Sequence, residues 1–327
     1  MITILSLLLA CSEPARVQEP VNPQITDAVT VDRTKLAAFQ PIPADFFGEI
    51  DEPRPELLAL GERLFRDPKL SGDGKISCNS CHNLETNGAD TLAFSLGHDG
   101  HPVGRNSPTV FNAAGQVAQF WDGRAKDVEE QALGPILAPG EMAAESPESV
   151  VQVLKNDHTY VVDFKAAFPG EADPITFKNV GFTIGAFERT LTKPSRWDKF
   201  LMGDDNALGD DEKRGVTTFV DLGCSGCHAG ALLGGSALMK LGAVSPWPNQ
   251  ADQGKFGLTK SEADRMVFKV APLRYATETA PYFHDASAPD LKTAIRMMAR
   301  HQLGKELDDA QVRDIEAWLG STSGPVE

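Results

Sequence analysis

One short pattern, present twice, constrains this chain more than any other feature. Residues 78–82 and 224–228 both read C-x-x-C-H, the attachment signature of a c-type haem. Two thiols three positions apart can form thioethers with the two vinyl groups of one porphyrin, and the histidine that follows then lies under the iron as an axial ligand. The sequence therefore predicts two covalent haems, held by Cys78, Cys81 and His82 and by Cys224, Cys227 and His228.

The same cysteines allow two other interpretations, a split Cys/His zinc site and two redox-active dithiol motifs. The two motifs use four of the five cysteines, and each motif has a histidine of its own. No further cysteine remains to complete a structural zinc site once Cys11 is assigned to the N-terminal segment. The pattern as a whole therefore favours two haems.

Length and charge narrow the class of protein. A chain of 327 residues with 41% hydrophobic residues is long enough for two domains, each with a core of its own. The net charge of −15 argues against a nucleic-acid partner. An acidic surface is compatible with a basic electron-donor protein, although many soluble proteins are acidic.

The N-terminal segment has the pattern of an export signal. Residues 1–11 form an apolar run that ends in Leu-Ala-Cys and is too short to span a bilayer as a helix. It resembles a bacterial lipoprotein signal, so we expect a lipid anchor on Cys11, with residues 12–45 as a tether. No Lys or Arg precedes the run, so removal of Cys11 with a secretory signal is the alternative. Haem attachment to C-x-x-C-H outside the bacterial cytoplasm predicts a periplasmic location in either case.

Similar helical patterns surround the two motifs. Leu57, Leu60 and Leu64 share one helical face before the first motif, and Gly-x-x-x-Phe occurs at 61–65 and again at 215–219, before the second. Apolar residues at helical spacing over 180–191 and 312–319, the latter after Asp308 as N-cap, predict a helix at the end of each unit. A small cytochrome c domain wraps its haem in this order. We predict a mainly α fold of two such domains, 46–197 and 205–327, with long loops over the haems.

The second axial position of each iron separates electron transfer from substrate chemistry. Met297 and Met298, in a helical stretch over 291–300, are the candidates at the second haem. Their spacing does not choose between them, and both fit equally well as core methionines. His98 and His101, on a glycine-flanked loop, are the candidates at the first haem. Two solvated surface histidines are the alternative.

Three residues between the motifs could serve peroxide chemistry. Cleavage of peroxide at a haem needs a group that moves a proton from the near oxygen to the far one. Glu141 could do this while Gln131 orients the peroxide, although by composition alone both are ordinary surface residues. Trp121 could lie between the haems, or pack a domain interface, or do both.

Seven stretches in order resemble the bacterial dihaem cytochrome c peroxidases, from about residue 55 to residue 320. Several unrelated blocks in the right order are much more specific than C-x-x-C-H alone. They are residues 76–83, 104–110, 120–124, 134–136, 224–228, 279–284 and 302–304.

The resemblance implies a different role for each haem. The haem on His82 would be the low-potential peroxidatic haem, with His98 as a removable ligand of its oxidised resting state. The haem on His228 would be the high-potential haem at which electrons enter. Its sixth ligand would be Met298, which stands at the family's spacing after His284.

The remaining site residues follow by position. Gln131 and Glu141 match the family's distal-pocket pair, and Trp121 matches the tryptophan between the haems. A calcium ion at the domain interface would be bound by Asn106 and by the backbone carbonyls of Thr279 and Pro281.

The implied activity is reduction of hydrogen peroxide to water with electrons from a small periplasmic donor, a cytochrome c or a cupredoxin. Homodimers are usual in the family, although nothing in this sequence itself indicates an interface. A related dihaem oxidase that modifies a protein substrate, as in methylamine dehydrogenase maturation, has Tyr in place of the Met ligand, so Met298 argues against it. A dihaem electron carrier needs no distal acid–base group, so Gln131 and Glu141 argue against that alternative.

Overall fold

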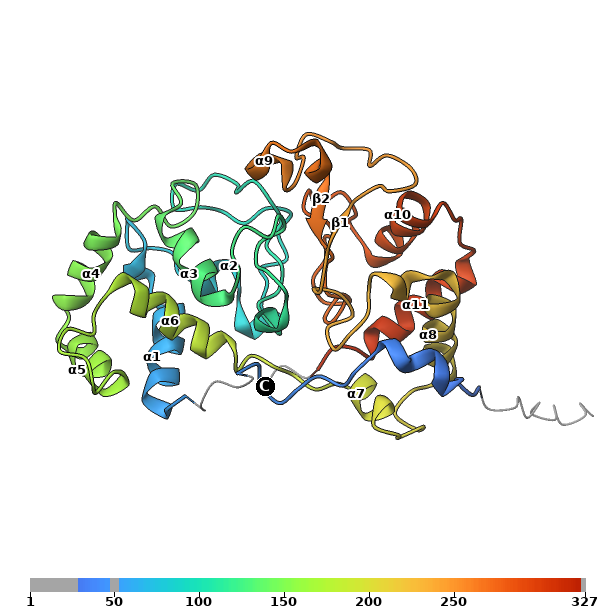
Figure 1. Ribbon diagram of the computed structural model, residues 1–327, viewed down its shortest axis with the longest axis horizontal. Helices are drawn as coiled ribbons and strands as arrows, with labels where there is room; N and C mark the ends of the chain where they lie inside the picture. Colours follow the sequence, from blue (N-terminus) through green and yellow to red (C-terminus); the bar gives the residue numbers. More distant parts are fainter. Residues whose placement is uncertain (1–28, 48–52, 325–327) are drawn as a thin grey trace, which may run out of the picture.

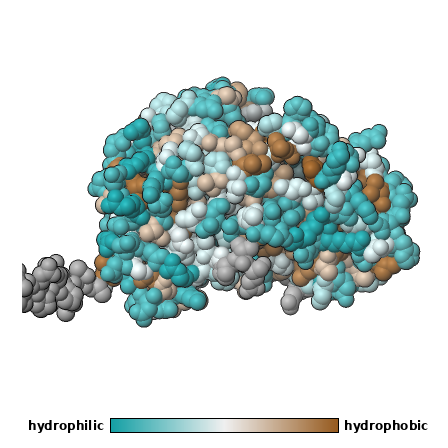
Figure 2. Space-filling model, turned by 180° about the vertical axis from the view of Figure 1, so that it is seen from behind, coloured by the Kyte–Doolittle hydropathy of each residue, from teal (hydrophilic) through white to brown (hydrophobic). Residues whose placement is uncertain are grey.

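The computed structural model describes residues 29–47 and 53–324 and consists of two helical lobes (Figure 1). The surface seen in Figure 2 is mostly hydrophilic, with smaller apolar groups between the polar side chains. Helices outnumber strands throughout the described residues. The α-helices are α1 (Pro55–Arg66), α2 (Cys78–Cys81), α3 (Val128–Leu137), α4 (Pro147–Lys155), α5 (His158–Ala167), α6 (Phe177–Glu188), α7 (Arg196–Leu201), α8 (Asp210–Leu222), α9 (Phe256–Thr259), α10 (Leu291–Leu303) and α11 (Asp309–Gly320).

One antiparallel pair of short strands accompanies these helices in the described part of the chain. Strand β1 (Leu238–Lys240) pairs with β2 (Val267–Lys269), with Leu238 opposite Lys269. Two hydrophobic cores account for the lobes: α1 and α3–α6 build the first, and α7, α8, α10 and α11 build the second. The predicted mainly α fold class is confirmed, and the domain boundaries at 46–197 and 205–327 stay predictions.

The helices predicted from apolar spacing are present, with one end displaced. Asp308 caps α11 as expected, because its side chain accepts a hydrogen bond from the Gln311 backbone N–H. Helix α6 ends at Glu188, so Leu191 lies beyond it, although the side chain is still buried. The apolar spacing continues past the helix because the segment that follows also packs on the core.

The repeated Gly-x-x-x-Phe has a structural explanation in both lobes. Gly61 in α1 crosses α6 so closely that a methyl group there would collide with the Thr183 carbonyl oxygen. Gly215 in α8 crosses α11, and a methyl group there would collide with the Asp314 carbonyl oxygen. The phenylalanines four positions later, Phe65 and Phe219, each line one of the two large cavities. The motif thus brings two helices together and turns an aromatic side chain toward a cavity.

The segment predicted as a tether contributes to the second core where it is described. Leu36, in the 3-10 helix η1 (Arg33–Ala38), and Phe39 are both 6% exposed. The Phe39 ring lies 5.6 Å from that of Trp197 in an edge-on contact. This part of the predicted tether therefore packs on the second core through its few apolar residues, and the bounds of the tether at 12–45 stay a prediction. Residues 1–28, including Cys11 and its predicted lipid, lie outside the described residues.

The segments on either side of the first lobe run together between the lobes (Figure 1). Phe46 N–H donates to the Arg189 carbonyl oxygen at 3.2 Å, and Thr192 Oγ1 donates to the Ala44 carbonyl oxygen at 2.6 Å. No helix within 29–47 or 53–324 is both long and apolar enough to cross a membrane.

We expect Gly61→Ala and Gly215→Ala each to lower the free energy of unfolding by about 1–3 kcal/mol, because the added methyl group has to push two helices apart. Gly257→Ala is the matched control, since its Cβ would meet no atom within 4 Å and it too lies in a helix. Chemical denaturation of the three variants measures the difference. Equal stability of all three would contradict the role given to the two crossings.

Two candidate haem sites

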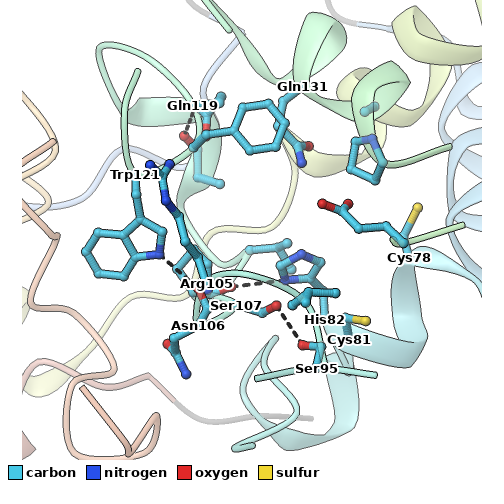
Figure 3. Close-up of a pocket in the computed structure, with 18 of the residues that line it drawn as sticks. Cys78, Cys81, His82, Ser95, Arg105, Asn106, Ser107, Gln119, Trp121 and Gln131 are labelled. Atoms are coloured by element: carbon cyan, nitrogen blue, oxygen red, sulfur yellow. Dashed lines mark hydrogen bonds between the residues drawn. The ribbon is translucent and has the colours of Figure 1, made fainter. Parts of the chain in front are cut away.

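The first C-x-x-C-H motif borders a cavity of about 390 Å³ in the first lobe (Figure 3). A capping box between Ser77 and Ser80 starts α2 at the first cysteine, so Cys78 and Cys81 fall within one helical turn. His82 ends this turn, and its Nδ1 lies 3.0 Å from the Pro108 carbonyl oxygen. With Nδ1–H as the donor, Nε2 keeps a free lone pair for the cavity.

The second motif repeats this arrangement around a cavity of about 240 Å³. Helix α8 ends at Leu222, and the C-cap residue Gly223, with a φ of 93°, turns the chain into the short 3-10 helix η5 (Cys224–Gly226). His228 Nδ1 lies 3.2 Å from the Leu233 carbonyl oxygen, which again leaves Nε2 free. Burial lowers the pKa of both His82 and His228, so both rings are neutral at neutral pH, the form that binds a metal.

These features fit covalent haem better than the two alternatives. All four motif cysteines are free thiols that line the cavities. Burial raises the pKa of Cys78 to about 12 and that of Cys224 to about 11, so neither is the thiolate that a redox dithiol needs. Across the described ranges, no cluster of three or more His, Cys, Asp or Glu side chains could hold a zinc ion.

Comparison with known proteins decides the family. A sequence model described as Di-haem cytochrome c peroxidase matches residues 55–206. Cytochrome c551 peroxidase of Pseudomonas aeruginosa is 43% identical over 326 residues, which cover 98% of this chain and 91% of that protein. The chain belongs to the dihaem cytochrome c peroxidase family. Its enzyme class is therefore that of a haem peroxidase with two c-type haems.

Two further likenesses show the breadth of this family. Methylamine utilization protein MauG of Methylorubrum extorquens is 36% identical over 243 residues, 74% of this chain and 68% of that protein. A solved MauG-like protein associated with microbial copper homeostasis is 26% identical, with a TM-score of 0.75 over 93% of this chain and 95% of that one.

The structure places the two neighbouring methionines of α10 differently with respect to the second cavity. Met298 lines the second haem cavity. Met297, one position earlier on α10, does not border the cavity, although both methionines pack against the small cluster that contains Trp247 and Phe268. Successive positions on a helix differ by about 100° in direction, which turns Met297 away from the cavity that Met298 borders.

The two loop histidines differ as well. His101 has an 81% exposed side chain and contacts Asp99, 3.0 Å away. His98 is half-buried, and within the described residues its Nδ1 is buried without a hydrogen-bond partner. Its backbone N–H donates to the Glu141 carbonyl oxygen at 2.8 Å, so the loop rests on the segment that carries Glu141. The His98 side chain is not among those that border the first cavity.

The three residues proposed for peroxide chemistry meet at the first cavity, and Figure 3 shows Gln131 and Trp121 on its wall. Glu141 borders the same space as His82. Burial raises the pKa of Glu141, and the guanidinium of Arg124 counteracts part of that rise. Trp121 borders both cavities, and its Nε1–H donates to the Asn106 carbonyl oxygen at 2.8 Å.

The proposed calcium ligands also come together. Asn106, Thr279 and Pro281 all border the second cavity, although Asn106 is far from the other two in the sequence. Asn106 Nδ2 donates to the carbonyl oxygens of Leu92, at 2.9 Å, and Ala93, at 3.3 Å. This orientation leaves the amide oxygen of Asn106 available as a ligand.

Two buried charged residues at the first cavity were not expected from the sequence. Glu188, at the end of α6, is 4% exposed, and burial raises its pKa to about 8. Lys269, at the end of β2, is 7% exposed. Lys269 is the single charge in the apolar run 266–272, which was the available signal, whereas Glu188 is followed directly by Arg189. Neither pattern shows which way the side chain points.

We expect Gly97→Ala to loosen the His98 loop, because a methyl group at this position would collide with the Gly140 carbonyl oxygen. Hydrogen–deuterium exchange of the loop amides measures the effect, which should be faster exchange at His98. Gly104→Ala is the control, since its Cβ would meet no atom within 4 Å. Unchanged exchange at His98 in Gly97→Ala would contradict the docking of this loop on residues 140–141.

Proposed function

We propose that this chain reduces hydrogen peroxide to water at the first cavity, with electrons that enter at the second cavity from a small donor, a cytochrome c or a cupredoxin. One observation carries the proposal. Of the described residues, those that border the second cavity include Met298 and no carboxylate, whereas Glu141 and Gln131 border the first. We place the enzyme in the periplasm, anchored by a lipid on Cys11.

Glu141 and Gln131 would handle the protons of the reaction. One hydrogen peroxide, two electrons and two protons yield two waters, and the haems, when bound, supply the electrons. A Glu141 carboxylate oxygen would accept the proton of one peroxide oxygen and return it to the other, so that the second oxygen leaves as water. The Gln131 amide would orient the peroxide by hydrogen bonding.

Met298 and His98 would give the two irons different roles, with electron entry at the second and peroxide reduction at the first. The Met298 thioether would hold the sixth position of the second iron, which raises its reduction potential and suits electron entry. His98 would hold the first iron in the resting state and leave it after half-reduction, and its Nδ1, which is buried without a partner among the described residues, supports such a role. Calcium on Asn106, Thr279 and Pro281 would couple the two sites.

We expect the haem-loaded protein to oxidise a reduced c-type cytochrome in the presence of peroxide and calcium, and to do so fast only after half-reduction. The measurement is absorbance of the cytochrome during turnover, with fully oxidised and with half-reduced enzyme. Turnover in both states would support the peroxidase activity and contradict the proposed release of His98 on half-reduction. No turnover in either state, with both haems attached and several donors tried, would favour an electron carrier or an oxidase that modifies a protein.

We expect Glu141→Gln to lower kcat by a factor on the order of 10²–10⁴, the usual contribution of one acid–base group. Because Glu141 must be ionised to accept a proton, kcat/KM of the parent should fall as the pH drops through the pKa of Glu141, which burial raises above its ordinary value. Steady-state kinetics against pH measures both effects. Glu145→Gln, an exposed carboxylate on the same segment, is the control and should behave as the parent does.

A further inference from the structure

The two haem cavities share a wall with a single charged side chain in it. Among the described residues, five border both cavities, and four of them carry no charge. The fifth is Lys269, whose ammonium group is the one cationic group common to the two spaces. The shared residues are Asn106, Pro108, Thr109, Trp121 and Lys269.

The backbone fixes Lys269 in this wall. It pairs with Leu238 across the β1–β2 ladder, and its N–H donates to the Trp121 carbonyl oxygen at 2.7 Å. The residue is 7% exposed, so the side chain cannot escape to solvent without disturbing that ladder. The lysine is thus bound to the same segment that carries the tryptophan between the cavities.

Lys269 has no carboxylate of its own in the described structure. The acid whose charge acts on it, Asp122, already accepts hydrogen bonds from Arg105 Nη1 at 2.7 Å and from Arg124 Nη1 at 3.1 Å. No hydrogen bond or ion pair to the ammonium group itself is present among the described residues, and burial lowers the pKa of Lys269 to about 8. A buried cation in this position is costly unless an anion enters beside it.

No acidic side chain among the described lining residues of the second cavity can pair with Lys269. The described lining of this cavity includes Lys240 and Lys269 and no Asp or Glu. A haem carries two propionate carboxylates, so a haem in either cavity would bring the missing negative charge. Lys240 differs from Lys269 in that it is exposed and borders the second cavity alone.

We propose that Lys269 is a positioning residue shared by the two haems, which pairs with propionate carboxylates from both cavities and raises both reduction potentials. A positive charge near a haem favours the form that has gained an electron, and the low dielectric of the buried wall strengthens this effect. The inference rests on the assignment of the two cavities to covalent haems.

The test uses the holoenzyme with Lys269→Met, Lys269→Arg and Lys240→Met. A spectroelectrochemical titration resolves the two one-electron steps. In Lys269→Met we expect the reduction equilibrium of each haem to fall about tenfold, which is about 59 mV for one electron. Lys269→Arg should keep both potentials near those of the parent, and Lys240→Met should move the second haem alone or neither.

A second readout separates ion pairing from a general structural effect. The propionate bending modes in resonance Raman spectra should shift in Lys269→Met and stay in place in Lys240→Met. A Lys269→Met enzyme in which neither potential moves, or only one, would overturn the proposal, as would unchanged propionate modes.

A measurement of haem attachment separates a failure of this inference from a failure of the proposed function. A haem stain on a denaturing gel, which detects covalent haem alone, shows whether both sites are filled. If Lys269→Met does not load, Lys269→Gln takes its place. If neither neutral variant binds both haems but Lys269→Arg does, the result would support the need for a cation at this position. If none of the three variants binds both haems, the proposal would be overturned. A parent chain without covalent haem would instead remove the haem assignment itself.

Discussion

The close crossing of two helices at a glycine, made once in each lobe, is the contact on which both haem sites depend. Gly61 lets α1 meet α6, and Gly215 lets α8 meet α11. A side chain at either crossing would separate the helices and move the phenylalanine one turn later, which borders the haem cavity. In the second lobe the effect reaches further, because α8 runs directly into the motif cysteines.

On this common frame, the loops make the two sites chemically different. The first cavity receives a half-buried glutamate and a glutamine from the residues around α3, and the second receives a methionine from α10 and no carboxylate within the described chain. The histidines on the two motifs are held alike, each with Nδ1 against a backbone carbonyl. The asymmetry between electron entry and peroxide chemistry therefore lies in what faces each haem from the far side.

Charge pairing joins the two lobes around the shared wall. Arg105 binds Asp252 of the second lobe through Nε, at 2.6 Å, and Asp122 of the first through Nη1, at 2.7 Å. Deeper in the second lobe, Arg274 and Asp198 form a fully buried bidentate pair, and the Arg274 guanidinium keeps the pKa of Asp198 low despite its burial. Against these paired charges, the lone ammonium of Lys269 between the cavities is the exception that calls for an anionic partner.

The sequence by itself determined the features that are local along the chain. The haem-binding cysteines and histidine of each motif lie within about one turn, the apolar residues of a helical face recur every three or four positions, and Asp308 caps a backbone N–H three residues later. Each of these patterns can be recognised in the sequence without knowledge of the fold. Helical spacing alone could not choose Met298 over Met297, a choice that came only from the family resemblance. The sequence also could not show that Leu36 and Phe39 pack on a core, or that Lys269 lies between two cavities. Those outcomes depend on which distant segments meet and on the direction a side chain takes when they do, and only the tertiary structure brings residues 106, 121 and 269 to one wall.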